Sequence, residues 1–188
     1  MKILFKFCAF LLLASTSISC SIQSKQYDFF KNIITKDDSD RPTPEWIIDW
    51  IGTTVDAFAI NHEKNVYFAT FDDHFIEYSN NQIVRIQGFF LKDHAMVIEV
   101  NNQNYNFLYN NNLISIDICN NWNERHVNSI DIIVKEQFCF EERSDYNYTN
   151  KLIMNYDQQI IALQFRVHPD YPVIQLRLNK YEESIYDM

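Results

Sequence analysis

The chain of 188 residues is 47% hydrophobic and 22% charged, and it carries a formal net charge of −9 at pH 7. This length suits one domain with a sizeable core. The acidic charge excludes nucleic acid as a partner and excludes electrostatic attachment to anionic lipid headgroups. The two glycines of the chain form neither a phosphate-binding loop nor a Gly-x-Ser-x-Gly nucleophile elbow.

Residues 1–20 have the pattern of an export signal. Lys2 is followed by an apolar run over Ile3–Leu13 and then by small residues that end at Cys20. The apolar run is shorter than the roughly 20 residues that an apolar helix needs to cross a bilayer. We therefore expect the segment to be removed rather than kept as a membrane span. Lys2 and Lys6 fall in this segment, which has no acidic residue, so the remaining chain has a net charge of −11.

Two ways of processing are compatible with the end of this signal. Ser17 and Ser19 suit an ordinary small-residue cleavage site, which would give a secreted protein in which Cys20 is incidental. Ile18-Ser19-Cys20 instead resembles the end of a bacterial lipobox, in which the cysteine is acylated and becomes the new first residue. We favour acylation of Cys20, because a short polar stretch follows it. Ser21 rather than Asp at the next position indicates the outer membrane, with the domain in the periplasm.

Residues 21–42 are predicted to be a polar tether with one small helix between Ser24 and Thr35. Thr43-Pro44-Glu45 has the pattern of a helix start, with threonine as the N-cap and proline in the first turn. The predicted helix has two turns, ends at Gly52 and places four apolar side chains on one face: Trp46, Ile47, Trp50 and Ile51. The two tryptophans suit either sugar stacking or core packing, and their helical spacing favours the core.

From Thr53 the hydrophobic period changes to two, which predicts a series of short strands. The first seven predicted strands are Thr54–Ile60, Val66–Phe71, His74–Ser79, Gln82–Phe90, Ala95–Val100, Tyr105–Tyr109 and Leu113–Cys119. Because glycine is nearly absent, asparagine must supply the left-handed turn positions between them. The asparagine turns are predicted at Asn80-Asn81, Asn101-Asn102 and Asn110-Asn111-Asn112.

The second half of the chain alternates over longer runs. In residues 129–140 the apolar side is predicted to comprise Ile130, Ile132, Val134, Phe138 and Phe140, and the polar side Asp131, Lys135, Gln137 and Cys139. Further strands are predicted at Lys151–Asn155, Ile161–Val167 and Ile174–Asn179. Residues 43–188 are therefore predicted to form one all-β domain, an antiparallel meander curled into a β-barrel-like or sandwich fold, with short N-terminal helices before it.

Cys119 and Cys139 are the two cysteines that remain after the signal is removed. In an oxidising compartment a single pair is most simply a disulfide, and neighbouring strands joined by a loop over Asn120–Asn128 would bring the two together. The alternative is two buried free thiols.

Neither the cysteines nor the five scattered histidines have metal-ligand spacing, so no metal site is predicted.

Carboxylates give the alternative of a periplasmic enzyme that acts on glycans, with Asp72, Asp73, Glu141 and Glu142 as candidates. A retaining glycosidase needs two carboxyl groups about 5 Å apart in a cleft, and an inverting one needs up to about 9 Å. For Asp72-Asp73-His74, a polar hairpin turn is the favoured interpretation. We predict no catalytic residue and no cofactor.

Aromatic residues beside asparagine turns suggest a ligand site at Tyr105, Tyr109 and Trp122. A ring stacks on the apolar face of a pyranose while neighbouring amides bond its hydroxyls. The alternatives are residues at the edge of the core and a protein partner that docks on an exposed strand edge.

Several segments resemble the YjbF-type lipoprotein family, also called group 4 capsule polysaccharide lipoproteins. They are the lipobox-like Cys20, Thr43–Ile47, Ile83–Phe89, Phe138–Glu142, Asn150–Met154, Gln159–Ile161 and Val173–Lys180. The resemblance implies a β-barrel-like periplasmic domain on an outer-membrane lipid anchor, associated with capsule or exopolysaccharide production and without established enzymatic activity. It therefore favours a binding or assembly factor whose partners are envelope proteins of polysaccharide export and a polysaccharide.

Overall fold

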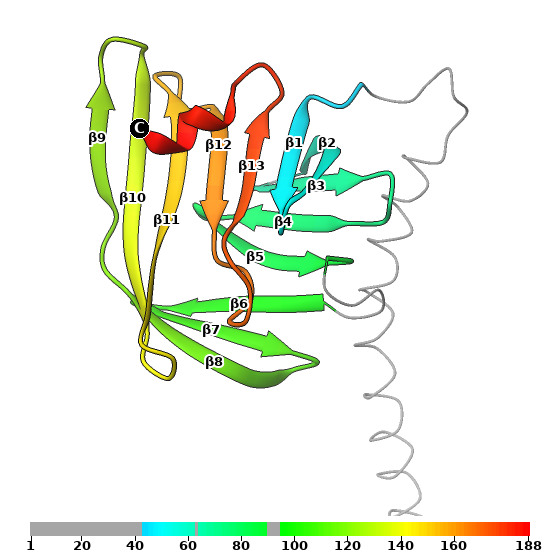
Figure 1. The fold of residues 1–188 in the computed structure, drawn as a ribbon, viewed down its shortest axis with the longest axis vertical. Helices are drawn as coiled ribbons and strands as arrows, with labels where there is room; N and C mark the ends of the chain where they lie inside the picture. Colours follow the sequence, from blue (N-terminus) through cyan, green and yellow to red (C-terminus); the bar gives the residue numbers. More distant parts are fainter. Residues whose placement is uncertain (1–42, 63, 90–94) are drawn as a thin grey trace, which may run out of the picture. The chain divides into compact units, whose positions relative to one another are not determined.

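The computed structural model describes residues 43–62, 64–89 and 95–188. The predicted export signal, the predicted acylation site Cys20 and the predicted tether helix lie outside these residues. The described chain, from Thr43 to Met188, is one compact unit built almost entirely from antiparallel strands (Figure 1).

The strands form one sheet that closes on itself. They are β1 (Trp46–Trp50), β2 (Thr53–His62), β3 (Asn65–Thr70), β4 (Phe75–Ser79), β5 (Gln82–Gln87), β6 (Ala95–Asn101), β7 (Asn104–Tyr109), β8 (Asn112–Cys119), β9 (Asn123–Val127), β10 (Ile132–Glu141), β11 (Tyr146–Asn155), β12 (Ile160–Phe165) and β13 (Ile174–Leu178). Neighbours follow chain order from β1 to β8, β8 pairs with β10, and β10–β13 lead back to β1. Twelve strands therefore form a closed antiparallel barrel, which confirms the predicted fold class.

The hairpin turns use asparagine as predicted. Asn80 and Asn81 have φ values of 51° and 63°. Asn110 and Asn111 have φ values of 51° and 62°, and Asn102 has a φ of 57°. Two successive residues with positive φ make the type I′ turn, whose twist matches that of the flanking strands. Asparagine therefore supplies in this chain the conformation that glycine supplies in most hairpins.

The predicted helix over residues 43–52 is wrong, because Trp46–Trp50 is the strand β1. Trp46 and Ile48 are buried and alternate with less buried residues, and the Trp46 ring meets Phe68 edge-on at a centroid distance of 4.7 Å. β1 pairs with β2 on one side and with β13 on the other. Hydrogen bonds to β13, whose residues pair with Trp46–Asp49 from the other end of the domain, thus outweigh the local helix signals. Ile51-Gly52 forms the turn to β2, with φ values of 46° and 73°.

The predicted faces of the strand over residues 129–140 are also wrong in their second half. Cys139 and Gln137 are 3% and 5% exposed, whereas Phe138, predicted to face the core, is 52% exposed. Ile132 and Val134 are buried as predicted, but they lie in a separate apolar cluster with Ile185 and Tyr186. The wall of the barrel is therefore polar on its inside at one end and apolar on its outside.

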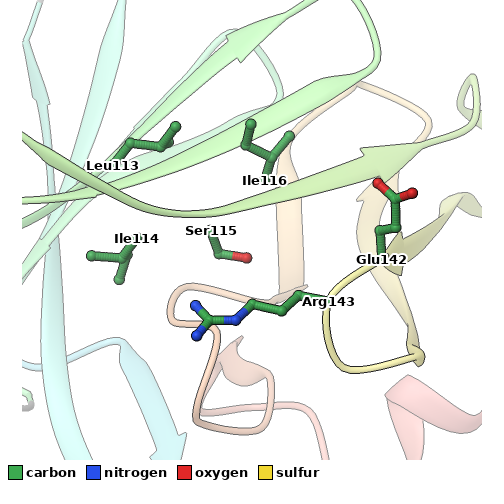
Figure 2. Close-up of a pocket in the computed structure, with 6 residues that line it drawn as sticks. All are labelled: Leu113, Ile114, Ser115, Ile116, Glu142 and Arg143. Atoms are coloured by element: carbon green, nitrogen blue, oxygen red, sulfur yellow. The ribbon is translucent and has the colours of Figure 1, made fainter.

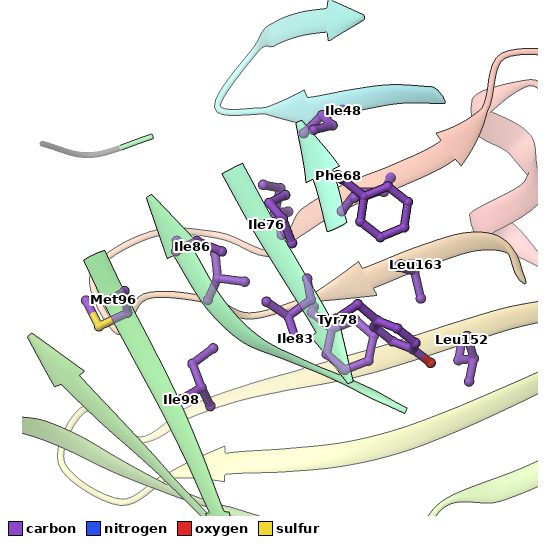
Figure 3. Packing of buried hydrophobic residues seen from close by; sticks show 14 of the residues in the cluster. Ile48, Phe68, Ile76, Tyr78, Ile83, Ile86, Met96, Ile98, Leu152 and Leu163 are labelled. Carbon is purple, nitrogen blue, oxygen red and sulfur yellow. The ribbon is translucent and has the colours of Figure 1, made fainter. Parts of the chain in front are cut away.

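The main core fills the inside of the barrel. It lies between β1 and β3–β6 on one side and β11–β13 on the other. Figure 3 shows Ile76, Ile83 and Ile86 packed with Leu152 and Leu163. A second apolar cluster lies under the C-terminal 3₁₀ helix η2 (Glu183–Asp187), which contributes Ile185 and Tyr186. Lys151 fastens this helix, because its Nζ donates to the Tyr186 carbonyl at 2.6 Å.

β9 was not predicted and falls in the expected loop over Asn120–Asn128. Its sequence, Asn-Glu-Arg-His-Val, is polar and lacks alternation, yet it pairs with Ile132–Glu136 of β10. Glu124 accepts from Lys135 of β10 at 3.1 Å. Backbone pairing to a long neighbouring strand, rather than a buried face, holds β9 in place.

Gly88→Ala should destabilise the barrel by about 2 kcal/mol. Gly88 has a φ of +89°, and a Cβ there would lie 2.6 Å from the Asp73 carbonyl oxygen. Gly52→Ala is the matched control, because Gly52 has a φ of +73° but nothing within 4 Å of its Cβ position. The control should cost about 1 kcal/mol. Urea unfolding measures both, and equal losses would contradict the close contact at Gly88.

Candidate functional site at the barrel seam

The barrel closes at a short ladder between β8 and β10, which we call the seam. Its register pairs are Cys119 with Cys139, Ile118 with Phe140, and Asp117 with Glu141. By contrast, β10 and β11 pair over their whole length from Ile132 to Glu141. Because so few backbone hydrogen bonds join the two sides of the ring here, side chains must supply much of the cohesion of the seam.

Cys119 and Cys139 form a disulfide across the seam. They stand directly opposite in the ladder with their Cα atoms 4.0 Å apart, and both are buried. The bond links the last residue of β8 to a residue near the end of β10, at the point where the chain leaves β8 and continues into β9. It therefore holds together the two strands that close the barrel.

Asp117 and Glu141 place two carboxylates opposite one another at the same seam. Like charges that face each other across a ladder are unfavourable, but Arg166 lies between them. Its Nη1 is 3.3 Å from Asp117 Oδ2 and its Nη2 is 2.7 Å from Glu141 Oε2. All three side chains are nearly or fully buried. The arginine thus converts a repulsive pair into a buried ionic cluster.

Arg166 is itself held from several directions. Its Nε donates to the His168 carbonyl at 3.3 Å and its Nη2 donates to the Pro169 carbonyl. The guanidinium carbon lies 4.8 Å from the centre of the Tyr146 ring and 5.0 Å from that of Tyr148. Cation–π contacts of this kind are strongest where water is excluded. The position of the arginine is therefore fixed by its surroundings and not only by its two carboxylates.

The pKa values of the two carboxyl groups are shifted in opposite directions, although burial acts to raise both. Loss of water raises the pKa of Asp117, and the hydrogen bond from Tyr148 Oη (2.7 Å) and the charge of Arg166 offset this only in part. Burial also acts to raise the pKa of Glu141, but hydrogen bonds from Ser144 and Arg166 outweigh it and leave that pKa below its ordinary value. Glu141 is therefore the anionic partner of Arg166, and Asp117 is the carboxyl group that more readily keeps its proton.

Asp117→Asn should make stability less dependent on pH. A carboxyl group whose pKa is raised in the folded state stabilises below its unfolded pKa, and this stabilisation is lost as pH rises through the folded pKa. Wild type should therefore lose stability relative to Asp117→Asn as pH rises above the ordinary aspartate value of 3.8, as measured by urea unfolding. Asp157→Asn, in an exposed turn, is the control. A stability difference between wild type and Asp117→Asn that does not change with pH would contradict the raised pKa.

A pocket of about 420 Å³ lies beside the ionic cluster, and we call it the seam pocket (Figure 2). Its lining residues are Leu113, Ile114, Ser115, Ile116, Glu142 and Arg143. The first half of β8 extends beyond the end of β10, so it faces the β10–β11 turn instead of a strand. Ser115 connects the pocket to the cluster, because its Oγ lies 3.2 Å from both Asp117 Oδ1 and Glu141 Oε1.

The predicted aromatic ligand site is not an exposed platform. Tyr105 is 3% exposed and its hydroxyl donates to Gln137 Oε1 at 2.8 Å, so its ring is not available to stack on a sugar. Trp122 is half-buried against the core, with its ring 6.0 Å from that of Phe165, and Tyr109 is half-buried as well. These three residues lie at the edge of the core or inside it. The tryptophans of β1 also pack against the core.

The predicted carboxylates are not brought together. Asp72 and Asp73 lie in the exposed turn between β3 and β4, where the Thr70 hydroxyl accepts from the Asp72 and His74 amides. Glu141 belongs to the buried cluster, whereas its neighbour Glu142 is exposed beside the pocket. In the part of the chain that the structure describes, no three metal-ligating side chains gather, and no helix is long and apolar enough to cross a bilayer.

Sequence reasoning missed Arg166, Asp117 and Tyr148, which form the centre of the site. Each occupies a polar or aromatic position on a strand or just after one, and alternation alone assigns such positions to solvent. The available signal was an arginine followed closely by Pro169 at the end of a strongly apolar run. That signal does not reveal that the inside of the barrel is polar at this end.

Comparison with solved structures identifies a protein with the same architecture. It is the hypothetical lipoprotein YmcC from Escherichia coli K12, with a TM-score of 0.53 and 8% sequence identity over 86% of this chain and 96% of that chain. The two chains share a fold. At this identity YmcC gives the fold and not the chemistry of the seam. No family model matches the chain, and no curated protein matches it.

Proposed function

We propose that this protein is a lipoprotein, acylated at Cys20 and held at the periplasmic face of the outer membrane, that acts as a binding or assembly factor in the export of capsule or exopolysaccharide. One observation carries the proposal: a chain with a lipobox-like cysteine shares its fold with the hypothetical lipoprotein YmcC over 96% of that chain. The resemblance to the YjbF-type family adds the link to surface polysaccharide.

The geometry of the seam favours binding or assembly over catalysis. Asp117 is fully buried and Glu141 is 4% exposed, so a glycosidic bond does not reach them, and both are engaged by Arg166. A glycosidase needs its two carboxyl groups on either side of a bound sugar. In this barrel the pair supports the wall instead.

The outer wall at the seam supports a role with protein partners. Ile116, Ile118 and Phe138 are 45%, 45% and 52% exposed and lie on β8 and β10, which pair at Ile118 and Phe140. Contiguous exposed apolar side chains on a small domain commonly mark contact sites. An assembly factor in the envelope would use such a wall to contact neighbouring export proteins.

Cys20→Ser should release the domain from the membrane fraction or leave an unprocessed precursor. Several acyl chains anchor firmly, since each buried methylene contributes about 0.8 kcal/mol. Intact-mass analysis of the wild-type protein should show a diacylglyceryl group on an N-terminal Cys20. Cys8→Ser, within the apolar run of the signal, is the matched control and should leave anchoring unchanged. An unmodified mature chain that begins elsewhere would refute the lipid anchor.

The role in export is tested in cells that lack this protein. Surface polysaccharide, measured by sugar analysis of the washed cell surface, should fall on deletion. It should return with the wild-type chain but not with Cys20→Ser. Unchanged surface polysaccharide in the deletion strain would refute the export function even if the protein is acylated.

A further inference from the structure

We propose that the seam pocket binds the carboxylate-bearing sugar of an acidic saccharide, with Arg143 as its anion-binding residue. This inference deepens the proposed function, on which it rests for the choice of a saccharide as ligand. The pocket has about 420 Å³, within the range of roughly 300–1,000 Å³ that small-ligand sites occupy.

Arg143 supplies the recognition of charge. Among the described residues it forms no ion pair or hydrogen bond, although the chain after the signal has 25 acidic residues. Figure 2 shows its side chain extending from the β10–β11 turn toward Ser115 and Ile114. A guanidinium group binds a carboxylate through two parallel hydrogen bonds. An arginine kept without a partner beside a pocket is therefore suited to an anionic group of a ligand.

Glu142 narrows the class of anion. Its carboxylate lines the same pocket but points away from the Arg143 guanidinium (Figure 2). A carboxylate accepts hydrogen bonds from hydroxyl groups and repels a second negative charge nearby. The lining thus has one positive and one negative charge, which disfavours a phosphate dianion and favours a monoanion rich in hydroxyl groups. A uronic acid has this composition.

The remaining walls suit the body of a sugar ring. Ile114 lies on the same side of β8 as Ser115 and Arg143 and gives apolar surface for the C–H face of a pyranose, whereas Leu113 and Ile116 line the rim from the other side of the strand (Figure 2). Ser115 adds a hydroxyl whose position is set by Asp117 and Glu141. A few placed polar groups among apolar walls are typical of ligand sites.

The seam pre-organises the pocket. β8 is tied to β10 by the Cys119–Cys139 disulfide, and Glu141, which precedes the lining residues of the turn, is held by Arg166 and Ser144. A site whose walls are fixed before binding loses less conformational entropy when the ligand binds. The ionic cluster and the disulfide therefore have a second use, as the support of the pocket.

Isothermal titration calorimetry on the processed chain, purified in mild detergent, tests the proposal. The probes are cellobiouronic acid, its neutral counterpart cellobiose, and inorganic phosphate. Cellobiouronic acid should bind with at least about tenfold higher affinity than either of the others. Arg143→Gln should weaken its binding by at least about tenfold, whereas Arg125→Gln, a 45% exposed arginine on β9, should not. Both variants should keep the wild-type melting temperature, because both side chains lie on the surface.

Three results would overturn the proposal: no heat from cellobiouronic acid up to its solubility limit, equal affinity for cellobiose or phosphate, or unchanged affinity in Arg143→Gln. These results are separable from those of the export experiment. If the purified protein binds the acidic disaccharide through Arg143 but deletion leaves surface polysaccharide unchanged, the export function fails and the pocket stands. If deletion lowers surface polysaccharide but no acidic saccharide binds, only the pocket assignment fails.

Discussion

Arg166→Met should lower the free energy of unfolding by about 4 kcal/mol. The variant keeps an unbranched apolar stem but leaves Asp117 and Glu141 facing one another in the buried seam without a cation between them. It also removes the contacts with the Tyr146 and Tyr148 rings. Urea unfolding followed by tryptophan fluorescence measures the loss, which should be largest at neutral pH and smaller in acid, where the carboxylates can take up protons.

Two further variants separate charge from packing at this position. Arg125→Met on β9 removes an exposed arginine whose contact with Glu136 is 3.8 Å long, and it should cost no more than about 0.5 kcal/mol. Arg166→Met combined with Asp117→Asn and Glu141→Gln should recover much of the lost stability, because no buried charge is then left unpaired. If Arg166→Met alone is as stable as wild type, the cluster does not hold the seam.

Replacing both seam cysteines with alanine should lower the free energy of unfolding by about 3 kcal/mol, the chain-entropy value for a loop of this size. The sequence separation is 20 residues, and the loop contains β9 and most of β10. Wild type unfolded in the presence of a reductant should lose a similar amount. An equal midpoint in urea for wild type and the double variant would contradict the stabilising role of the disulfide.

The state of the two thiols is checked separately by alkylation. In denaturant without reductant, wild type should take up no label at Cys119 or Cys139, and after reduction it should take up one label at each. Cys119→Ala is the informative control, because it frees the thiol of Cys139 and should give one label without any reductant. Labelling of both residues in unreduced wild type would show that the seam is held without a covalent bond.

The strands β2–β8 were predictable because each has a regular alternation and a short turn leads to the next, whereas the first half of β11 was missed. Alternation located β2–β8 to within a few residues, apart from the end of β5, and the asparagine pairs located their turns. The prediction failed at β1, whose partner β13 lies at the other end of the domain. It also failed at β9, whose polar residues are held by backbone pairing with β10 and by ion pairs to it rather than by a buried apolar face. Local pattern does not contain the information about partners that are distant in the chain.

The site was less predictable than the fold, because the barrel has polar side chains inside it. Alternation separates two faces of a strand but does not say which one is enclosed. At Phe138 and Cys139 the apolar side chain faces solvent and the residue on the polar side is buried. Asp117, Glu141 and Arg166 come from separate strands and a following loop, so their proximity depends on the register of the closed ring. The three side chains come together only in the folded barrel.

The pairing of β1 with β13 has a consequence for how the domain forms. The first and last strands are joined by register pairs such as Trp46 with Leu178, so the ring cannot be completed until nearly the whole domain is available. Contacts between residues so far apart in sequence make folding slow. A chain synthesised from its N-terminus therefore remains without its closed barrel until its last strand is available. Under the proposed export route that strand would also be the last to cross the membrane, so closure of the ring would follow translocation.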